Sequence, residues 1–406
     1  MKIWIINHYA TPPEYGSSTR HYYLAKELNK AGHEVTIIAS SNHHLINQKI
    51  SNHFDTWQDE FVKFILLPSL DYQDNSLQRL GNMLSFAWQT LQLPKKIAQR
   101  PDIIIGSSVH PFAVWSAKKL ANQYKIPFCF EVRDLWPQTL IDMKVIVYYH
   151  PFAIILRLLE AYLYQQANLI ITLLPYAYEY ISRFKIPQQK VVYLPNGVDL
   201  DLFSNVQLEQ KKRDYLTVMY CGSHGPANGL DTLIEAAAIL EKNSVSQLIR
   251  WRLIGDGNQK KYLQNQIDQL GLISIKLEDA IPKKQIPETI NESDILVFHL
   301  LNVDVFQYGV SPNKLFEYLV SQKPIVFACA ARNNPVAEAN AGITVAPEDA
   351  QAMANAIREI VALPVSERTK MGQRGRAYVE KYHSYANLGQ QLNTLLKEVV
   401  KEHTKP

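Results

Sequence analysis

The feature that most constrains this fold is an alternation of short apolar, β-rich runs with longer segments of helical periodicity. This pattern is typical of parallel sheets whose strands are joined by crossover helices. In the first half of the chain, it predicts strands at 2–6, 34–39, 61–66, 103–105, 128–132 and 169–172. In the second half, it predicts strands at 216–220, 250–254, 274–277, 295–298, 324–328 and 343–345. The same α/β plan therefore occurs twice.

The length of 406 residues fits two domains better than one core. We expect two doubly wound, Rossmann-like α/β domains facing across a cleft, with the junction near residues 200–212. The predicted divisions are 1–200, 201–385 and a C-terminal helix at 386–406 that crosses back to the first domain. Helical periodicity also covers 18–31, 77–98 and 375–401.

Composition narrows the class of protein. The chain is 47% hydrophobic and 20% charged, as expected for a globular protein, and its net charge of +4 is too weak to indicate a nucleic-acid partner. The widely spaced Cys129, Cys221 and Cys329 suit a reducing cytoplasm. The first residues do not resemble a signal peptide, and polar residues interrupt the most apolar stretch, 145–174. Any membrane contact is therefore expected to be peripheral.

A glycine-containing loop opens the second half. The strand LTVMY runs into CGSHGPANG and then into the helix LDTLIEAAAIL. Gly222, Ser223, Gly225 and Gly229 would let the backbone approach a ligand, and the helix behind them would direct its N–H groups at an anion. We interpret the loop as a diphosphate cradle. An ordinary strand-to-helix turn is the alternative.

A second motif, SPNKLFEYL, predicts a helix N-terminus facing the same ligand. Ser311 is the expected N-cap and Pro312 the first helical residue. Asn313 would offer an amide, and Lys314 a charge for phosphate. Glu317, about one turn later, would accept hydrogen bonds from a ribose. A surface Lys–Glu pair is the alternative.

Two loops of the first half carry further candidates at the expected carboxyl edge of the sheet. Gly16 and Ser17 precede a helix in which Arg20 would hold an acceptor phosphate, unless it merely faces solvent. In RDLWP, Arg133 and Asp134 follow a strand, and Asp134 would take a sugar hydroxyl while Trp136 contacts a sugar face. A structural Arg–Asp pair beside a core tryptophan is the alternative.

Two other patterns received plainer interpretations. Asp199 and Asp201 imitate a metal-binding pair but have no ligand cluster nearby, so we expect no metal site. In the helix at 77–98, the Met, Leu and Trp residues between Leu77 and Leu91 are interpreted as helix core. The competing hypothesis is that this helix lies on an anionic membrane. That surface would be formed by Met83, Phe86, Trp88 and Leu91, with Arg79, Lys95, Lys96 and Arg100 around them.

With these residues in hand, the chain resembles family 4 of the retaining glycosyltransferases, which have the GT-B architecture of two Rossmann-like domains. Within that family it is most similar to bacterial surface-polysaccharide enzymes of the N-acetyl-fucosamine transferase type. The motifs that carry the resemblance are PPEYGSSTRHYYLAKELNKAGHEVTII, VRDLWP, LYQQANLIITL, LPNGVD, YCGSHGPANGLDTLIEAA, LIGDGNQKKYL, SPNKLFEYLVSQKPIV and GRAYVEKYHS.

The resemblance implies a nucleotide-sugar donor, expected to be a UDP-sugar, in the C-terminal domain. It places Glu317 on the ribose, and Lys314 and the Gly222–Gly225 loop on the diphosphate. It also implies an acceptor near Gly16 and Arg20, an acceptor class of lipid-diphosphate-linked glycans, and no metal or cofactor. Two departures stand out: Gly309 replaces the first of two glutamates common in the family, and Ser223 and Asn228 replace loop cations.

For the reaction, we expect same-face attack, with the leaving-group oxygen taking the acceptor's proton. The residues assigned to catalysis are Arg133, Asp134, Lys314 and Glu317. Two alternatives remain open from sequence: a sugar-nucleotide 2-epimerase of the same architecture, and a non-catalytic nucleotide-binding subunit.

Overall fold

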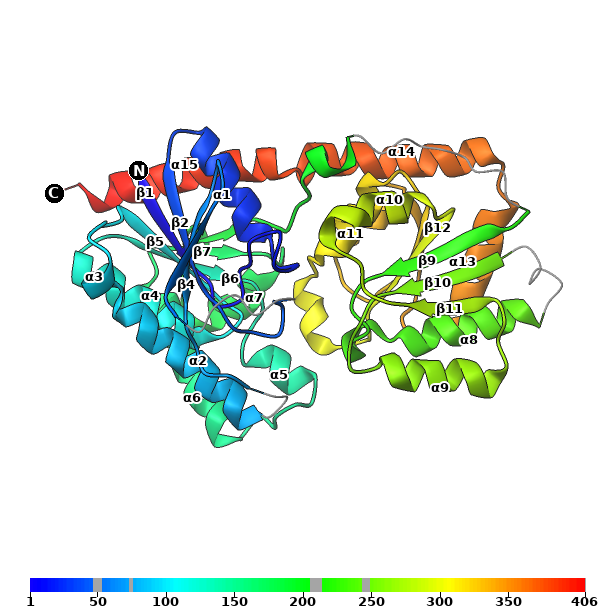
Figure 1. The fold of residues 1–406 in the computed structure, drawn as a ribbon, viewed down its shortest axis with the longest axis horizontal. Helices are drawn as coiled ribbons and strands as arrows, with labels where there is room; N and C mark the ends of the chain where they lie inside the picture. Colours follow the sequence, from blue (N-terminus) through cyan, green and yellow to red (C-terminus); the bar gives the residue numbers. More distant parts are fainter. Residues whose placement is uncertain (47–52, 73–75, 205–213, 243–248, 406) are drawn as a thin grey trace. The chain divides into compact units, whose positions relative to one another are not determined.

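A computed structural model describes residues 1–46, 53–72, 76–204, 214–242 and 249–405 (Figure 1). The chain forms two compact units, each of the α/β class. The N-terminal unit comprises Met1–Asn196, Tyr308–Val310 and Tyr385–Pro406, and the C-terminal unit comprises Gly197–Gln307 and Ser311–Ser384. Much of the expected junction at 200–212 falls on 205–213, which lies outside the described residues.

The N-terminal unit is built on a sheet with the strand order β3-β4-β2-β1-β5-β6-β7-β8. β3 pairs antiparallel with β4, and the other neighbours are parallel. All six strands expected in this half are confirmed. The pattern missed β3 and β8, which are short and have no fully buried residue. The strands are β1 (Lys2–Ile6), β2 (Glu34–Ser40), β3 (Asp55–Gln58), β4 (Lys63–Leu67), β5 (Ile103–Ser107), β6 (Phe128–Val132), β7 (Leu169–Thr172) and β8 (Val191–Tyr193).

The C-terminal unit has an all-parallel sheet in the order β11-β10-β9-β12-β13-β14. This is the 3-2-1-4-5-6 order of dinucleotide-binding domains. Each of its strands overlaps an expected strand, so the prediction for this half is confirmed. The strands are β9 (Leu216–Cys221), β10 (Ile249–Ile254), β11 (Ile275–Glu278), β12 (Ile295–His299), β13 (Ile325–Ala328) and β14 (Gly342–Val345).

Helices cover the sheets, because parallel strands must be joined by crossovers and are buried on both faces. In the N-terminal unit, α2 and α6 both pack against α4. In the C-terminal unit, α8 packs against α9 and α13, while α11 packs against α14 (Figure 1). The N-terminal helices are α1 (Arg20–Lys30), α2 (Ser76–Leu91), α3 (Leu93–Lys96), α4 (Pro111–Tyr124), α5 (Gln138–Asp142), α6 (Pro151–Gln166) and α7 (Ala177–Ile181). The later helices are α8 (Leu230–Glu241), α9 (Lys260–Leu270), α10 (Ile286–Asn291), α11 (Asn313–Val320), α12 (Pro335–Glu338), α13 (Ala350–Ala362), α14 (Val365–Tyr382) and α15 (Tyr385–His403).

The C-terminal helix returns to the N-terminal unit, as expected, and α15 packs against α1. The prediction of a single helix over 375–401 is wrong, because helical structure stops after α14 and resumes at α15. At the break, the backbone N–H of Val198 donates to the carbonyl of His383 at 2.9 Å, which diverts the chain from helical pairing. Among the described helices, none combines the length and apolar character required to cross a bilayer.

Candidate active site

In the C-terminal unit, two glycine-containing loops meet where β9 and β10 end. The backbone N–H of His224 donates to the carbonyl of Asp256 at 2.8 Å. A Cβ atom on Gly255 would lie 1.8 Å from the carbonyl oxygen of Gly222, and one on Gly257 would lie 2.5 Å from that of His224. Glycine is therefore required at both positions because the two backbones touch.

Helix α11 points its first turn toward this pair of loops. It begins at Asn313, and the extended Pro312 precedes it as N-cap without a side-chain cap. The expected N-cap role of Ser311 is therefore wrong, because the proline's extended ψ of 129° places the helix start one residue later than predicted. Ser311 still lies directly before the helix and makes polar contacts of its own.

The Lys314 side chain lies directly over Gly222. Its ammonium donates to the Tyr220 hydroxyl at 2.7 Å and to Oδ1 of Asn228 at 3.1 Å. A Cβ atom at Gly222 would lie 2.6 Å from Nζ, so any larger residue there would displace the lysine. Both hydrogen-bond partners are neutral, and burial lowers the pKa of Lys314 to about 7. The site therefore holds a partly desolvated cation that has no carboxylate partner among the described residues.

Glu317, one turn further along α11, is buried and faces a different lysine. Its carboxylate pairs with the ammonium of Lys283, which belongs to a short 3-10 turn after β11. Burial lowers the pKa of Lys283 to about 8. The interpretation of Lys314 and Glu317 as a mutual surface pair is therefore not what the structure shows. Sequence reasoning missed Lys283, because the contact joins positions 34 residues apart.

Among the residues that the structure describes, other buried polar atoms near this edge have no hydrogen-bond partner. Neither ring nitrogen of the buried His224 makes a hydrogen bond, and Oδ1 of Asn313 makes none. Ser223 is exposed and Gly225 half-buried, and the carbonyl of Ser223 accepts from Tyr220 and Asn228. These unused groups are what a polar ligand would need.

His299, which the sequence analysis did not single out, holds the loop that contains Asn228 in place. The backbone N–H of Glu348 donates to its Nε2 at 2.8 Å. Its Nδ1 must therefore carry the proton, and it donates to the carbonyl of Asn228 at 3.0 Å. Gly229, in the left-handed region with φ of 48°, leaves the room that this ring occupies. The histidine thus holds the residue that contacts Lys314.

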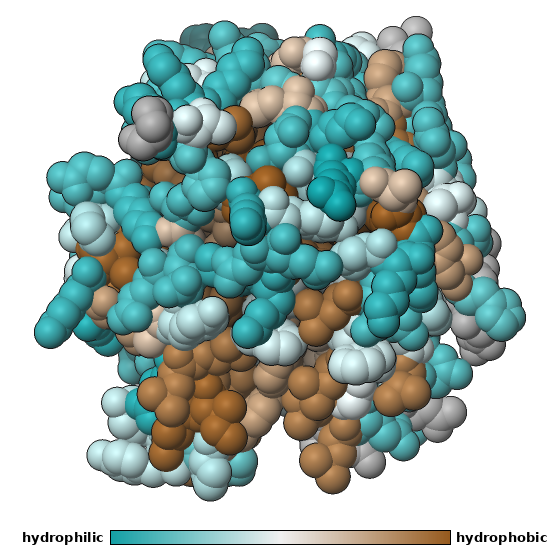
Figure 2. Space-filling model, turned by 90° about the vertical axis from the view of Figure 1, so that its left-hand side faces the viewer, coloured by the Kyte–Doolittle hydropathy of each residue, from teal (hydrophilic) through white to brown (hydrophobic). Residues whose placement is uncertain are grey.

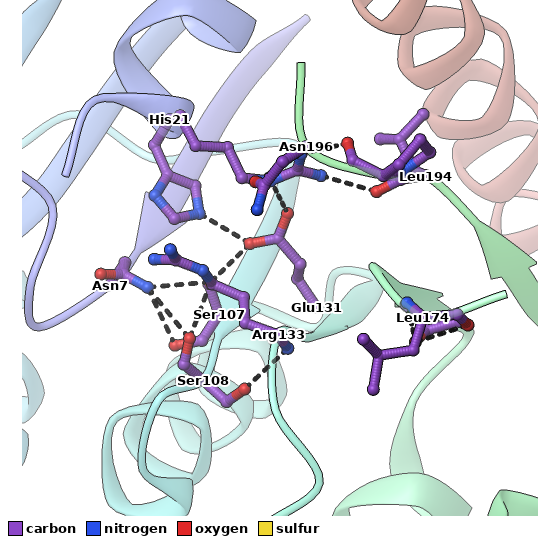
Figure 3. A network of polar contacts seen from close by, with 12 residues as sticks. Asn7, His21, Ser107, Ser108, Glu131, Arg133, Leu174, Leu194 and Asn196 are labelled. Atoms are coloured by element: carbon purple, nitrogen blue, oxygen red, sulfur yellow. Dashed lines mark hydrogen bonds and ion pairs between the residues drawn. The ribbon is translucent and has the colours of Figure 1, made fainter. Parts of the chain in front are cut away.

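In the N-terminal unit, a buried network joins the ends of β5 and β6 to α1 (Figure 3). The carboxylate of Glu131 accepts from Nε of Arg20 at 3.0 Å, from Nε2 of His21 at 2.6 Å and from Oγ of Ser107 at 2.5 Å. Burial alone would raise the pKa of Glu131, but these charges and hydrogen bonds hold it well below its usual value. Glu131 is a fixed anion inside the protein.

Arg20 uses its remaining donors within the same network. Its Nη2 donates to the carbonyl of Leu194 at 2.9 Å, and Nη1 contacts the carbonyl of Pro195 and Oδ1 of Asn196. The residue is 1% exposed. Neither a solvent-facing role nor direct acceptor contact matches this geometry. Arg20 instead ties α1 to the chain that follows β8.

Gly16 and Ser17, the other acceptor candidates, lie in the loop between β1 and α1. Gly16 is buried and pairs with Ile46, and a Cβ atom there would lie 2.2 Å from the carbonyl oxygen of Leu45. Close backbone packing therefore explains this glycine without a ligand. Ser17 is exposed, so its hydroxyl faces outward.

Arg133 and Asp134 follow β6 and differ in exposure, because Arg133 is half-buried and Asp134 is exposed. The backbone N–H of Arg133 donates to Oγ of Ser108 at 3.0 Å, and its Nη1 is buried without a hydrogen-bond partner (Figure 3). Asp134 is exposed and Trp136 half-buried. Although Glu131 and Asp134 raise the pKa of Arg133, burial dominates and lowers it. At this edge, Arg133 is the predicted site residue that keeps unused binding capacity.

The aspartate pair has a structural role. Oδ1 of Asp199 accepts from the backbone N–H of Asp201 at 3.2 Å and so caps a short 3-10 turn. Within the described ranges, His, Cys, Asp and Glu side chains form no group of three that could hold a metal ion.

Comparisons with known proteins identify families and structures that this chain resembles. A model described as glycosyltransferase family 4 matches residues 16–202, and one described as glycosyl transferases group 1 matches residues 204–378. The structure is similar to sucrose-phosphate synthase from Thermosynechococcus elongatus, with 16% identity, 99% of each chain covered and a TM-score of 0.76. It is also similar to HepE from Anabaena in complex with UDP and glucose, with 16% identity, 98% of this chain and 99% of that chain covered and a TM-score of 0.67. A trehalose-6-phosphate synthase studied for glycosyl transfer with retention gives 11% identity, coverage of 98% and 99%, and a TM-score of 0.71. No curated protein matches the sequence. The structural matches confirm the predicted fold.

Proposed function

We propose that this chain, whose two halves match the models of glycosyltransferase family 4 and of glycosyl transferases group 1, is a GT-B glycosyltransferase that transfers a sugar from a UDP-sugar to a glycan acceptor with retention of configuration. The observation that carries the proposal is the ammonium of Lys314. It is held over Gly222 by two neutral groups, at the N-terminus of α11 and at the carboxyl edge of a dinucleotide-type sheet. A diphosphate is the ligand that such a cation fits.

For the donor, we assign the diphosphate to Lys314 and the Gly222–Gly225 loop, with backbone amides of Ser223 and Asn313 nearby. Glu317 is assigned to the ribose hydroxyls, because a carboxylate already held by Lys283 is fixed in position to accept them. The choice of uridine is supported by HepE, a fold neighbour whose structure contains UDP.

In the proposed reaction, the bond between the donor's anomeric carbon and the diphosphate oxygen breaks. The acceptor hydroxyl oxygen forms the new bond to that carbon on the same face, and its proton passes to the departing diphosphate oxygen. Lys314 stabilises the charge that develops on the diphosphate. We assign Arg133 to an anionic group of the substrates and Asp134 to a sugar hydroxyl.

We further infer that a bound metal is not required, because Lys314 and backbone amides supply the charge compensation. The acceptor is proposed to be a lipid-diphosphate-linked glycan at the cytoplasmic face of a membrane, in surface-polysaccharide synthesis of the N-acetyl-fucosamine transferase type. The motif resemblance supports this assignment of pathway and acceptor.

The experiment is a screen of nucleotide diphosphates by calorimetry, followed by turnover of the matching sugar nucleotides. We expect UDP to bind more tightly than ADP or GDP. The product's anomeric configuration, read by NMR, should equal the donor's. A changed sugar formed from donor alone would indicate the epimerase instead, and binding without any donor hydrolysis or transfer would indicate a non-catalytic subunit.

A further inference from the structure

Helix α2 exposes an apolar face that its periodicity suggested would be core. Leu77, Leu84 and Trp88 are exposed, whereas Met83 and Phe86 are buried. The interpretation of this helix's Met, Leu and Trp residues as core therefore holds for Met83 and is wrong for Leu77, Leu84 and Trp88, which lie away from the side that packs against α4. The membrane face expected around Met83 and Phe86 is corrected for the same reason.

The segment before α6, and α6 itself, expose a second set of large apolar side chains. Every member of the combined set is at least 42% exposed. We call the set the apolar edge, and it comprises Leu77, Leu84, Trp88, Val145, Val147, Tyr148, Tyr149, Ile154, Ile155 and Leu158.

The two parts of the apolar edge belong to one side of the N-terminal unit. Both α2 and α6 pack against α4, and both lie at the lower margin of this unit in Figure 1. Figure 2 shows apolar side chains gathered along the lower part of the same face, below a largely polar surface. Apolar patches of this extent on a soluble domain mark an interaction surface.

The two segments that carry the apolar edge bear charges of one sign, and the described acids that flank them, Asp71 and Asp142, accept hydrogen bonds from Asn42 and Gln138. Residues 76–100 contain no Asp or Glu, and neither do residues 143–159. The next acid, Glu160, is buried and accepts hydrogen bonds from Tyr164 and Tyr180. Exposed cations accompany the patch on both sides, among them Arg79, Lys95 and Lys144.

From these observations we propose that the apolar edge docks onto an anionic lipid bilayer. A second copy of the chain would have to meet these cations with acids, and residues 76–100 and 143–159, which carry the apolar edge, contain none. Trp88, Tyr148 and Tyr149 are the residue types that prefer the interface between headgroups and acyl chains. The proposal goes beyond the proposed function, because lipid binding requires no sugar transfer.

The test uses the full chain and two kinds of vesicle, pure phosphatidylcholine and phosphatidylcholine with phosphatidylglycerol. We expect co-sedimentation with the anionic vesicles that weakens with salt. A variant with Val147→Ser, Tyr149→Ser and Leu158→Gln should lower the partition coefficient at least about tenfold. Lys144→Glu, which removes one positive charge and adds a negative one, should lower it at least about fivefold.

The matched controls are Ile273→Ser and Lys261→Glu, which change an exposed apolar residue and an exposed cation of the C-terminal unit. Neither should alter vesicle binding. Equal binding by the triple variant and the wild type would overturn the proposal. The proposal would also be overturned if the wild type did not bind vesicles but formed a dimer in ultracentrifugation that the triple variant could not form. The surface would then join two copies of the chain. UDP affinity, measured on the same proteins, should stay unchanged. If the wild-type protein did not bind UDP, that result would count against the proposed function but not against the lipid-binding proposal.

Discussion

Replacing Lys314 with alanine should weaken UDP binding about tenfold to a hundredfold. The ammonium lies at the N-terminus of α11 and is held by Tyr220 and Asn228, so it is positioned for a charge-assisted hydrogen bond to phosphate. Such a bond contributes roughly 1.5–3 kcal/mol, which converts to that range of affinity.

The pH dependence provides a sharper signature. Burial lowers the pKa of Lys314 from 10.5 to about 7, so the free protein loses this charge as the pH rises above 7. Bound diphosphate favours the charged form and must raise that pKa. UDP affinity should therefore be constant below pH 7. Above pH 7 it should fall by up to about tenfold per unit, with proton uptake on binding.

Calorimetry from about pH 7 to pH 9, in buffers of different ionisation enthalpy, measures both quantities while the terminal phosphate stays ionised. Lys261→Ala, which removes an exposed lysine, should behave as wild type. Lys283 has a pKa of about 8 and titrates in the same range, so Lys283→Ala separates its contribution. If Lys314→Ala kept the wild-type affinity and the wild-type pH slope, the assignment of the diphosphate to Lys314 would be refuted.

Three further predictions address the donor, the metal and the buried network. Glu317→Gln should weaken UDP roughly tenfold but leave pyrophosphate affinity unchanged, because pyrophosphate has no ribose and the amide oxygen can still accept from Lys283; calorimetry with both ligands tests this. Transfer activity should survive excess EDTA, and loss of turnover that manganese or magnesium restores would contradict the metal-independent proposal. Glu131→Gln should lower the free energy of unfolding in urea by roughly 3–5 kcal/mol, since it leaves the Arg20 charge buried without its partner. An unchanged midpoint would count against that account.

The strands could be predicted because their signal is local. A buried parallel strand is a continuous apolar run, and β1, β6 and β12 show it plainly. The contacts that define the sites are not local. Glu317 meets Lys283 across 34 positions, and Arg20 meets Glu131 across 111. No periodicity encodes which distant partner a charged side chain will have.

Helix α2 shows a second limit of sequence patterns. Its apolar residues cover more than one stripe, so the sequence identifies an amphipathic helix but not which stripe the neighbouring helix covers. In the structure α2 packs against α4 and Phe86 stacks on His8, so that Met83 and Phe86 are buried while Leu77 and Trp88 stay exposed. Residues predicted as acceptor contacts, such as Gly16, likewise have packing reasons that only the fold reveals.

Buried neutral histidines should make the protein less stable as the pH falls. Burial lowers the pKa of His43 and His110 to about 3 and that of His224 to about 4. In the unfolded chain these rings take up protons near pH 6.5, so the stability they confer is present above 6.5 and is lost as the pH falls below it. Between about pH 7 and pH 5, each should cost roughly 2 kcal/mol.

One buried carboxyl acts in the opposite direction. Burial raises the pKa of Glu160 to about 8, so between its unfolded pKa of 4.5 and pH 8 the folded state binds the extra proton and gains stability as the pH falls. This gain, roughly 2.5 kcal/mol over the same interval, offsets little more than one histidine. Stability should therefore still decline toward pH 5, and more steeply in Glu160→Gln. His43→Asn, which keeps a polar acceptor for the N–H of Leu45, should make the decline shallower by about 2 kcal/mol. Urea titrations across this range measure both slopes. Equal slopes in the wild type and the His43 variant would mean that His43 takes up its proton over the same pH range in the folded protein as in the unfolded chain.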